Sequence, residues 1–130
     1  MSVYDDVLEA ICELADAAQT YSDIVIGSMP PDNGISIAWS ASSLNEFMNK
    51  NAIVTMTAVL NGKHCDQKSV SAALGEVHRV LTRRKRYPEA ENFQITNIST
   101  LGAPIYIGRE ANSQWLYGSS LRVRFFLRGD

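Results

Sequence analysis

The sequence predicts an α+β domain, in which a mainly antiparallel sheet of about four to five strands carries two main helices packed on one face. Apolar residues recur at helical spacing in two stretches, residues 3–19 and 66–82. The stretches between and after them alternate apolar and polar residues, as strands with one covered face do. Because strand follows strand with single helices between them, we expect mostly antiparallel pairing. The 130 residues contain no repeat or long linker, so residues 1–130 are expected to form a single domain.

The first elements are a helix over residues 3–19 and a short strand over residues 23–28. Acidic residues flank the apolar stripe of the helix, and those in its first turn suit the positive end of the helix dipole. Residues 29–34 (MPPDNG) predict a turn, because prolines cannot donate to a strand ladder and Asn-Gly readily takes positive φ. Residues 35–40 (ISIAWS) alternate cleanly. The two strands are therefore predicted to form a hairpin.

The middle of the chain is predicted to hold a central strand and the second helix. Residues 42–50 are interpreted as one or two helical turns. Residues 52–60 (AIVTMTAVL) are β-branched and mostly apolar, which indicates a central strand covered on at least one face. The Asn-Gly pair that follows is expected to end it. In the helix over residues 66–82, Asp66 is placed to accept hydrogen bonds from the free amides of the first turn.

The last part of the chain reads as strands. Residues 93–99 and 103–108 are predicted to be strand segments interrupted near Leu101 and Gly102, and residues 114–127 a long final strand. Near the end of that strand, successive residues should point to opposite faces. One face carries Leu121, Val123, Phe125 and Leu127, and the other carries Arg122, Arg124, Phe126 and Arg128.

No side chains in the sequence form a recognisable catalytic, metal or cofactor pattern. His64, Cys65 and Asp66 are neighbours in a tight connection, and such neighbours seldom converge on one reacting atom, so Cys65 is not predicted to be catalytic. His78 lies off the apolar stripe of its helix and is interpreted as a solvated residue. Cys12 falls within the first helical stripe and is interpreted as a small buried hydrophobe. We expect neither enzymatic activity nor a bound cofactor or metal.

Charge is unevenly distributed along the chain, although the net charge is only −2. Residues 1–66 contain nine acids and two lysines, giving −7, whereas residues 67–130 contain ten bases and five acids, giving +5. Such a split fits either one surface on which both charges mix or unlike faces that meet between subunits. The acidic start and the lack of a long apolar run predict neither a signal peptide nor a transmembrane helix, so the protein is expected to remain in the cytosol.

Two stretches are candidates for contacts with other molecules. The basic run Arg83, Arg84, Lys85 and Arg86 complements the dipole at the end of its helix, and it also suits an acidic partner protein or nucleic-acid phosphates. Nearby aromatic residues are too few for a base-stacking platform, so a nucleic-acid-binding module using this run is the alternative function.

The final strand gives the stronger signal, because an outward aromatic residue among arginines is typical of the centre of an interface. The alternative there is that a loop of the chain covers the aromatic side chain. The candidate contact residues from the two stretches are Arg83, Arg84, Arg86, Arg122, Arg124 and Phe126.

The order of elements and the ending PIYIGREANSQWLYGSSLRVRFFL resemble the small minor capsid or tail terminator proteins of long-tailed bacteriophages and prophages. The resemblance spans most of the chain. It rests on an acidic first helix, a turn with prolines, a β-branched strand, an amphipathic helix and the residues from Trp115 to Phe126. Head–tail joining proteins are similar in size and are an alternative within the same class.

The resemblance implies a structural protein without an active site. Members of the family form a homo-oligomeric ring, commonly a hexamer, that caps the tail tube and joins it to the head connector. The implied partners are further copies of the chain, the tail tube protein and the head–tail connector protein, with a passing contact with DNA and none with a membrane. The implied location is the virion, assembled in the cytoplasm of a bacterial host.

Overall fold

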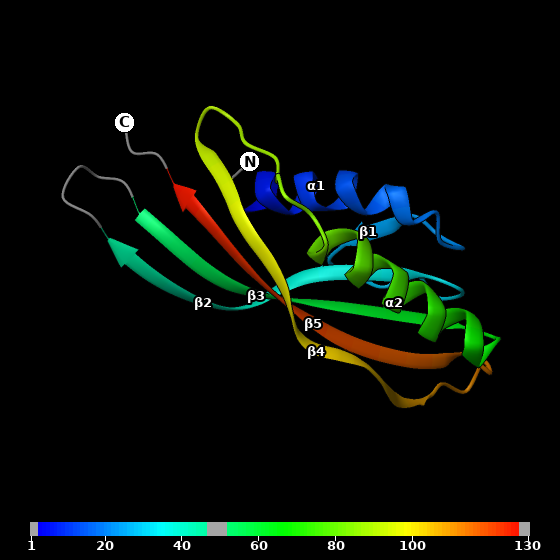
Figure 1. Cartoon of the computed structure of the whole chain (residues 1–130). Coiled ribbons are helices and arrows are strands. Elements are labelled where there is room, and N and C mark those ends of the chain that lie inside the picture. Colours follow the sequence, from blue (N-terminus) through cyan, green and yellow to red (C-terminus); the bar gives the residue numbers. More distant parts are fainter. Residues whose placement is uncertain (1–2, 47–51, 128–130) are drawn as a thin grey trace.

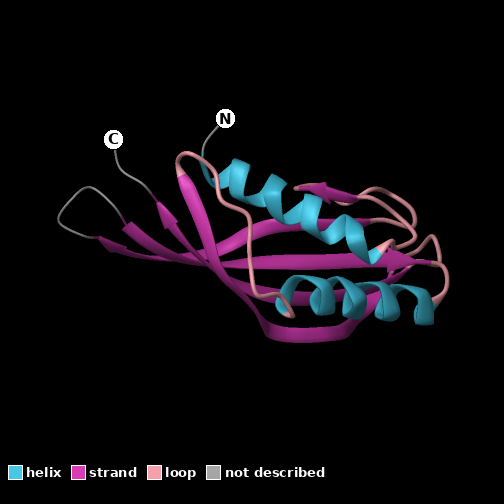
Figure 2. Cartoon of the chain, turned by 45° about the horizontal axis from the view of Figure 1, so that its top comes forward, coloured by secondary structure: helices cyan, strands magenta, loops and turns pink. Residues whose placement is uncertain are grey.

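A computed structural model describes residues 3–46 and 52–127 and shows a sheet with helices packed against it (Figure 1). The main helices are α1 (Val3–Ala15) and α2 (Gln67–Thr82), and a short 3₁₀ helix, η1 (Asp16–Ala18), follows α1. The strands are β1 (Ile24–Ile26), β2 (Ile35–Glu46), β3 (Ala52–His64), β4 (Phe93–Arg109) and β5 (Trp115–Leu127). The predicted α+β fold is confirmed, because both main helices lie on one face of a mostly antiparallel sheet (Figure 2). None of the helices in the described part of the chain is long and apolar enough to cross a membrane.

The five strands lie in the order β1-β2-β3-β5-β4. All neighbours are antiparallel except β1 and β2, which run parallel with Ile24 opposite Ile35. The predicted hairpin between these two strands is therefore wrong. Gly27 has a φ of 93° and donates its N–H to the carbonyl of Ile37 at 2.9 Å, so the chain turns away at the end of β1. The loop over residues 27–34 then carries it back to the start of β1 before β2 begins.

The pairing of β2 with β3 corrects two further predictions. Residues 42–46 were expected to be helical but continue β2, and each pairs with a residue of β3. Partners on β3 satisfy the backbone groups of this segment across the ladder, which outweighs a weak local preference for helix. The rest of that predicted helix, residues 47–50, lies outside the described residues. Asn61 and Gly62 do not end β3, because β2 pairs with it as far as Gly62 and β5 pairs with it as far as His64.

The core lies between the sheet and the helices. The expected alternation of β3 and β5 is confirmed, since Val54, Ala58 and Leu60 are buried on one face of β3. Trp39 on β2 stacks near Phe125 and donates its indole N–H to the carbonyl of Tyr4 at 3.1 Å, which fastens α1 to the sheet. The largest fully buried side chains come from both helices and four strands: Val7, Ile11, Ile35, Ile37, Val54, Leu60, Leu74, Leu81, Ile95, Ile98, Leu121 and Phe125.

The second helix follows the predicted bounds, with Asp66 at its N-cap. The carboxylate of Asp66 accepts a hydrogen bond from the Ser69 hydroxyl at 2.7 Å, and this bond is the main reason that the pKa of Asp66 is lowered. The helix packs closely on β3 at Gly62, where a Cβ would lie 2.9 Å from Val70 Cγ2 and 3.2 Å from Leu74 Cδ2. Glycine is therefore the residue that allows this approach of helix to strand.

The position of His78 beside the apolar stripe predicted a solvated side chain, and this prediction is wrong. It is only 5% exposed, and its Nδ1 and Nε2 lie 2.8 Å from Thr100 Oγ1 and 2.8 Å from Ser119 Oγ. Because Ser119 donates its hydroxyl hydrogen to the carbonyl of Leu60 at 2.8 Å, it accepts from Nε2–H, and Nδ1 accepts from Thr100. The neutral imidazole thus joins α2 to β4 and β5, and burial lowers the pKa of His78.

Candidate interaction site

The face of the sheet that the helices leave uncovered, here called the open face, is the first candidate surface. Residues of β5 alternate between the helices and this face. The three contact residues predicted on this strand all point to the open face: Arg122 and Arg124 are exposed, and Phe126 is half-buried. A shallow hollow of about 260 Å³ borders Phe126, Arg124 and Ile53. The basic and aromatic side chains expected at an interface centre therefore lie together.

One half of the open face is polar and basic. Arg122 lies opposite Thr57 of β3, and Arg124 lies opposite Thr55. On the other side of β5, the same two arginines lie opposite Ser99 and Asn97 of β4. Among the described strand residues whose side chains share this face, none is a carboxylate. This half therefore carries positive charge that no neighbour on the face neutralises.

The other half of the open face is apolar. Ile105 and Ile107 of β4 and Val59 of β3 line a shallow hollow of about 270 Å³. Gly118 of β5 forms part of its floor, where a Cβ would overlap the side chain of Ile107. The backbone of Gly102 also borders the hollow. We call this region the apolar end of the open face.

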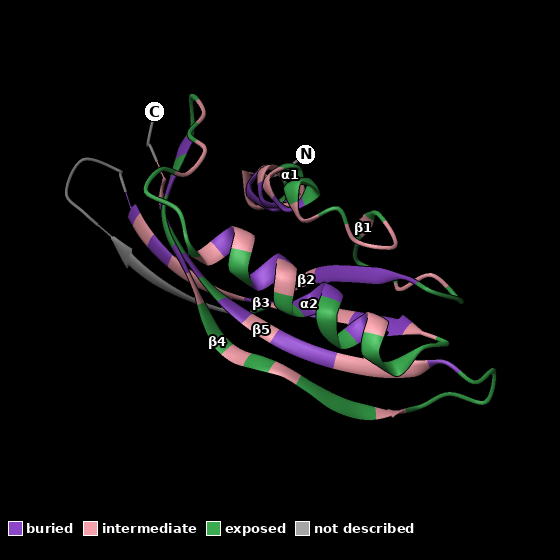
Figure 3. Cartoon of the chain, turned by 45° about the vertical axis from the view of Figure 1, so that its right-hand side comes forward, coloured by how far each residue is buried: buried purple, intermediate pink, exposed green. Residues whose placement is uncertain are grey.

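The most exposed large hydrophobic side chains among the described residues all belong to the two edge strands. On β4 they are Leu101, Ile105, Tyr106 and Ile107, with exposed fractions of 46%, 64%, 50% and 55% (Figure 3). On β1 they are Val25 and Ile26, at 38% and 39%. Monomeric proteins usually protect sheet edges with charge, proline or cover, so the two edge strands are candidate interaction surfaces.

The strand β4 is irregular where these side chains occur. Its register with β5 shifts between Thr100 and Gly102 and again between Gly102 and Ile105. The predicted interruption near Leu101 and Gly102 is therefore a local irregularity within one continuous strand. On its outer side, the isolated bridge between Glu89 and Gln94 is the only pairing in the described part of the chain. The outer edge of the second half of β4 is thus unpaired within the described chain.

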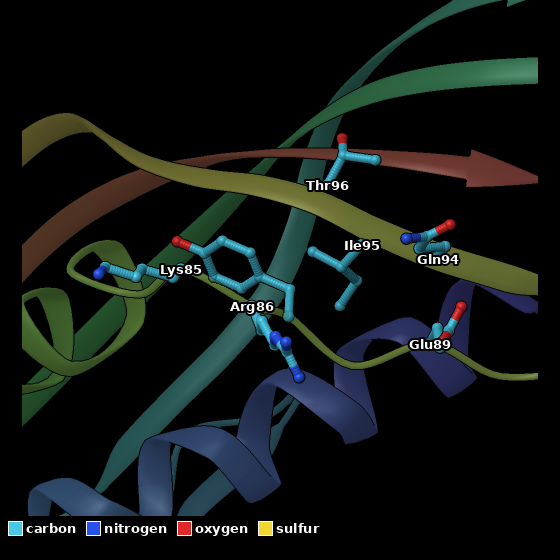
Figure 4. Close-up of a pocket in the computed structure, with 7 residues that line it drawn as sticks. Lys85, Arg86, Glu89, Gln94, Ile95 and Thr96 are labelled. Atoms are coloured by element: carbon cyan, nitrogen blue, oxygen red, sulfur yellow. The ribbon is translucent and has the colours of Figure 1, made fainter.

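The basic run lies elsewhere, on the loop between α2 and β4. Arg83, Arg84 and Arg86 are all exposed, and the Arg84 Nε–H donates to the carbonyl of Arg86 at 3.1 Å. Tyr87 anchors the loop by donating its hydroxyl to the carbonyl of Leu81 at 2.9 Å. A polar pocket of about 430 Å³ lies beside this loop. Figure 4 draws the residues that line it, which are Lys85, Arg86, Tyr87, Glu89, Gln94, Ile95 and Thr96.

The six predicted contact residues therefore fall into two groups. Arg122, Arg124 and Phe126 share the open face, whereas the basic run follows α2 in the helix layer. Thr96 on β4 borders both the loop pocket and the hollow beside Phe126. It sits at a register shift of β4 and donates its hydroxyl to the carbonyl of Arg124 at 3.0 Å.

The side chain of His64 is held by a backbone hydrogen bond and by an aromatic neighbour. Nδ1 of His64 accepts the backbone N–H of Asp66 at 2.9 Å, and Cys65 Sγ lies 3.7 Å from the same nitrogen. The ring of Tyr21 packs edge-on against His64 with centroids 4.5 Å apart. Because Nδ1 is already engaged by a backbone amide, it is not placed to take a proton from the thiol. Over the residues that the structure describes, no group of histidine, cysteine and acidic side chains could hold a metal ion.

The exposed residues of β4 are the candidate contact residues that the sequence analysis did not identify. Residues 103–108 (APIYIG) alternate like any strand with one buried face, so Ile105 and Ile107 were expected to be ordinary strand residues. Two signals were present. Pro104 cannot donate to a ladder, which favours an edge strand, and Gly102 indicates an irregularity.

Comparisons with known proteins give one kind of match. We find no match to the sequence among known protein-family profiles or among curated protein sequences. Among solved structures, a chain from the virion of a native gene transfer agent particle has the same fold. It superimposes with a TM-score of 0.51 at 15% sequence identity, covering 98% of this chain and 92% of that chain.

Proposed function

We propose that this protein is a structural component of a phage-like virion and that it acts by contact with other proteins, without catalysis. The observation that carries the proposal is the set of exposed apolar side chains on β4 next to an uncovered basic sheet face. A fold shared with a chain of a gene transfer agent virion supports the same class of protein. The resemblance of the sequence to tail terminator and minor capsid proteins points in the same direction.

Within that class, we propose the tail terminator role. Copies of the chain would form a ring, commonly of six subunits, that caps the tail tube and meets the head–tail connector. The two edge strands lie on opposite sides of the sheet, and this arrangement suits head-to-tail contacts that close into a ring. Arg122, Arg124 and Phe126 are the proposed contact residues on the open face. The protein would be assembled in a bacterial cytoplasm and end in the virion.

The test is the state of association in the presence of the cognate tail tube protein. Sedimentation velocity in moderate salt, with and without that protein, should reveal a species several times the mass of one 14.4 kDa chain. Electron microscopy of that species should show closed rings at the ends of tubes. A protein that stays monomeric at high concentration, both alone and with the tube protein, would overturn the proposal.

The second candidate function is nucleic-acid binding through the basic run. The observation in its favour is that Arg83, Arg84, Lys85 and Arg86 are all exposed on one loop. Binding of this kind would weaken steeply as salt increases, because each phosphate contact releases counterions. Fluorescence anisotropy with labelled duplex and single strands tests it directly. A flat titration at low ionic strength would remove this candidate.

A further inference from the structure

We propose that, in the assembly proposed above, the β1 edge of one copy docks on the apolar end of the open face of the next copy. This inference rests on the proposed function and names the two surfaces that meet. Val25 on β1 would cover Ile105 and Ile107 on β4 of the neighbouring copy, and Ile26 lies beside it on the same edge. The contact is head-to-tail, because the two surfaces are different and lie on opposite edges of the same sheet.

The first support is the distribution of exposed apolar residues. All six of the most exposed large hydrophobic side chains among the described residues lie on β1 or β4. A two-fold contact of β4 with β4 would bury the larger patch but leave β1 exposed. A contact of β1 with β4 covers both patches in every subunit of a closed ring, so no apolar edge remains in water.

The second support is charge complementarity. Around β1 the charged residues are acidic: Asp23 precedes the strand, and Glu13 is exposed on α1, which contacts β1. Around the apolar end, the cation that shares the open face is Arg122, whereas Arg109 at the end of β4 lies opposite Trp115, with its guanidinium 5.0 Å from the centroid of that ring.

The nearest carboxylate to the apolar end in sequence, Glu110, is already paired with Lys63 at 2.8 Å. Docking β1 on the apolar end therefore brings acids toward Arg122, which has no carboxylate opposite it on either neighbouring strand. A contact of β4 with β4 would instead place like charges together.

The third support is the shape of the apolar end. The hollow is bordered by glycine at positions 102 and 118, and the lack of a side chain at Gly118 lets Ile107 lie close to the sheet. Val25 shares its side of the sheet with Ser36, its partner on β2, so it faces the same side as the hollow. The short strand β1 offers aliphatic side chains of a size to enter such a hollow. One edge of the sheet thus carries an apolar depression and the other an apolar projection. Such a pair of surfaces allows each copy to contact the next in the same head-to-tail manner.

The test is disulfide cross-linking between copies in a Cys65→Ser background, because Cys65 is exposed and would react. We would make Val25→Cys and Ile105→Cys as separate proteins, mix them under conditions of assembly with the tail tube protein, and oxidise. The proposal expects a covalent dimer in the mixture and none from either variant alone. The matched control is Ser71→Cys, an exposed site on α2, which should not cross-link with either variant.

The outcomes separate this inference from the proposed function. Rings that form normally but cross-link Ile105→Cys to itself, or that give no product in the mixture, would overturn the docking of β1 on β4 and leave the ring intact. If sedimentation shows only monomers with the tube protein present, the proposed function itself fails. A covalent ladder from the Val25→Cys, Ile105→Cys double variant, extending beyond a dimer, would show that the contact repeats around the assembly.

A charge variant gives a second readout that does not depend on cysteine chemistry. Asp23→Arg should weaken assembly measured by sedimentation, and Arg122→Asp should do the same. Because both residues are exposed, neither change should affect folding. Mixing the two single variants should restore one complementary contact and yield dimers without larger rings. Weakening by Asp23→Arg with no recovery in the mixture would show that these two charges do not meet.

Discussion

Replacing His78 with glutamine should change how the stability of the fold depends on pH. The imidazole is buried between α2 and the sheet, with Nε2 donating to Ser119 and Nδ1 accepting from Thr100. Burial lowers its pKa from the ordinary value of 6.5. The unfolded chain therefore binds a proton at a higher pH than the folded chain does, and stability falls as the pH drops below that value.

The size of the change in unfolding free energy follows from the hydrogen bonds of His78 and from its protonation in the unfolded chain. At pH 7.5, glutamine can replace one of the two hydrogen bonds of His78, so the free energy of unfolding should fall by about 1–2 kcal/mol. Below the ordinary pKa, wild-type protein loses up to about 1.4 kcal/mol for each pH unit, whereas His78→Gln lacks this contribution. At pH 5 the loss reaches at most about 2 kcal/mol, so the difference in stability between the two proteins should narrow as the pH falls from 7.5 to 5.

Urea denaturation followed by circular dichroism measures this difference at a series of pH values. Carboxylates titrate in the same way in both proteins, so the difference between them isolates His78. The slope of the unfolding free energy against pH near pH 6 gives the number of protons taken up on unfolding, and this number should be larger for wild-type protein than for His78→Gln. Two curves that stay parallel from pH 7.5 to pH 5 would refute the neutral, buried state of His78.

Three further predictions concern packing and reactivity. Gly62→Ala should destabilise the fold by about 1–3 kcal/mol, because the new methyl group would crowd Val70. Gly75→Ala, which has open space around it, should instead stabilise α2 by about 0.5–1 kcal/mol. Thermal denaturation of the two variants measures both effects. Tyr21→Phe should cost about 1–2 kcal/mol in urea, because the hydroxyl lies within hydrogen-bond distance of two backbone carbonyls. A disulfide reagent at pH 8 should modify the exposed thiol of Cys65 and spare Cys12, whose pKa burial and the nearby Asp16 raise to about 11; equal rates for both would contradict this.

The elements that could be predicted from sequence are those whose residues have one environment along their whole length. In β3 and β5 every second residue faces the helices, so the alternation in the sequence reports burial directly. The apolar stripe of α2 is readable for the same reason. These patterns depend only on the local period of the chain and on the presence of one core.

The features that could not be predicted depend on residues distant in sequence. The parallel pairing of β1 follows from how the loop over residues 27–34 redirects the chain, and a pattern of prolines and glycines does not determine that path. His78 is buried because Thr100 and Ser119, 22 and 41 residues away, supply its hydrogen-bond partners. Periodicity records hydrophobicity and not the partners of a polar group, so His78 was interpreted as solvated.

The candidate site shows the same division. The outward direction of Arg122 and Arg124 follows from alternation alone, and the structure places them accordingly. The exposure of Ile105 and Ile107 depends on β4 being an edge strand, which is a property of strand order. Strand order is set by long-range pairing, because β5 enters between β3 and β4. The apolar end could therefore be recognised only once the topology was known.

The position of β5 also bears on how the chain is made. Because β5 pairs with β3 on one side and with β4 on the other, β3 and β4 are joined in the sheet only through β5. During synthesis, the edges of β3 and β4 would remain unpaired until β5 leaves the ribosome. A stop codon placed before Trp115 would remove the strand that joins β3 to β4, and β4 would then be held to the rest of the domain only through its contacts with the helices.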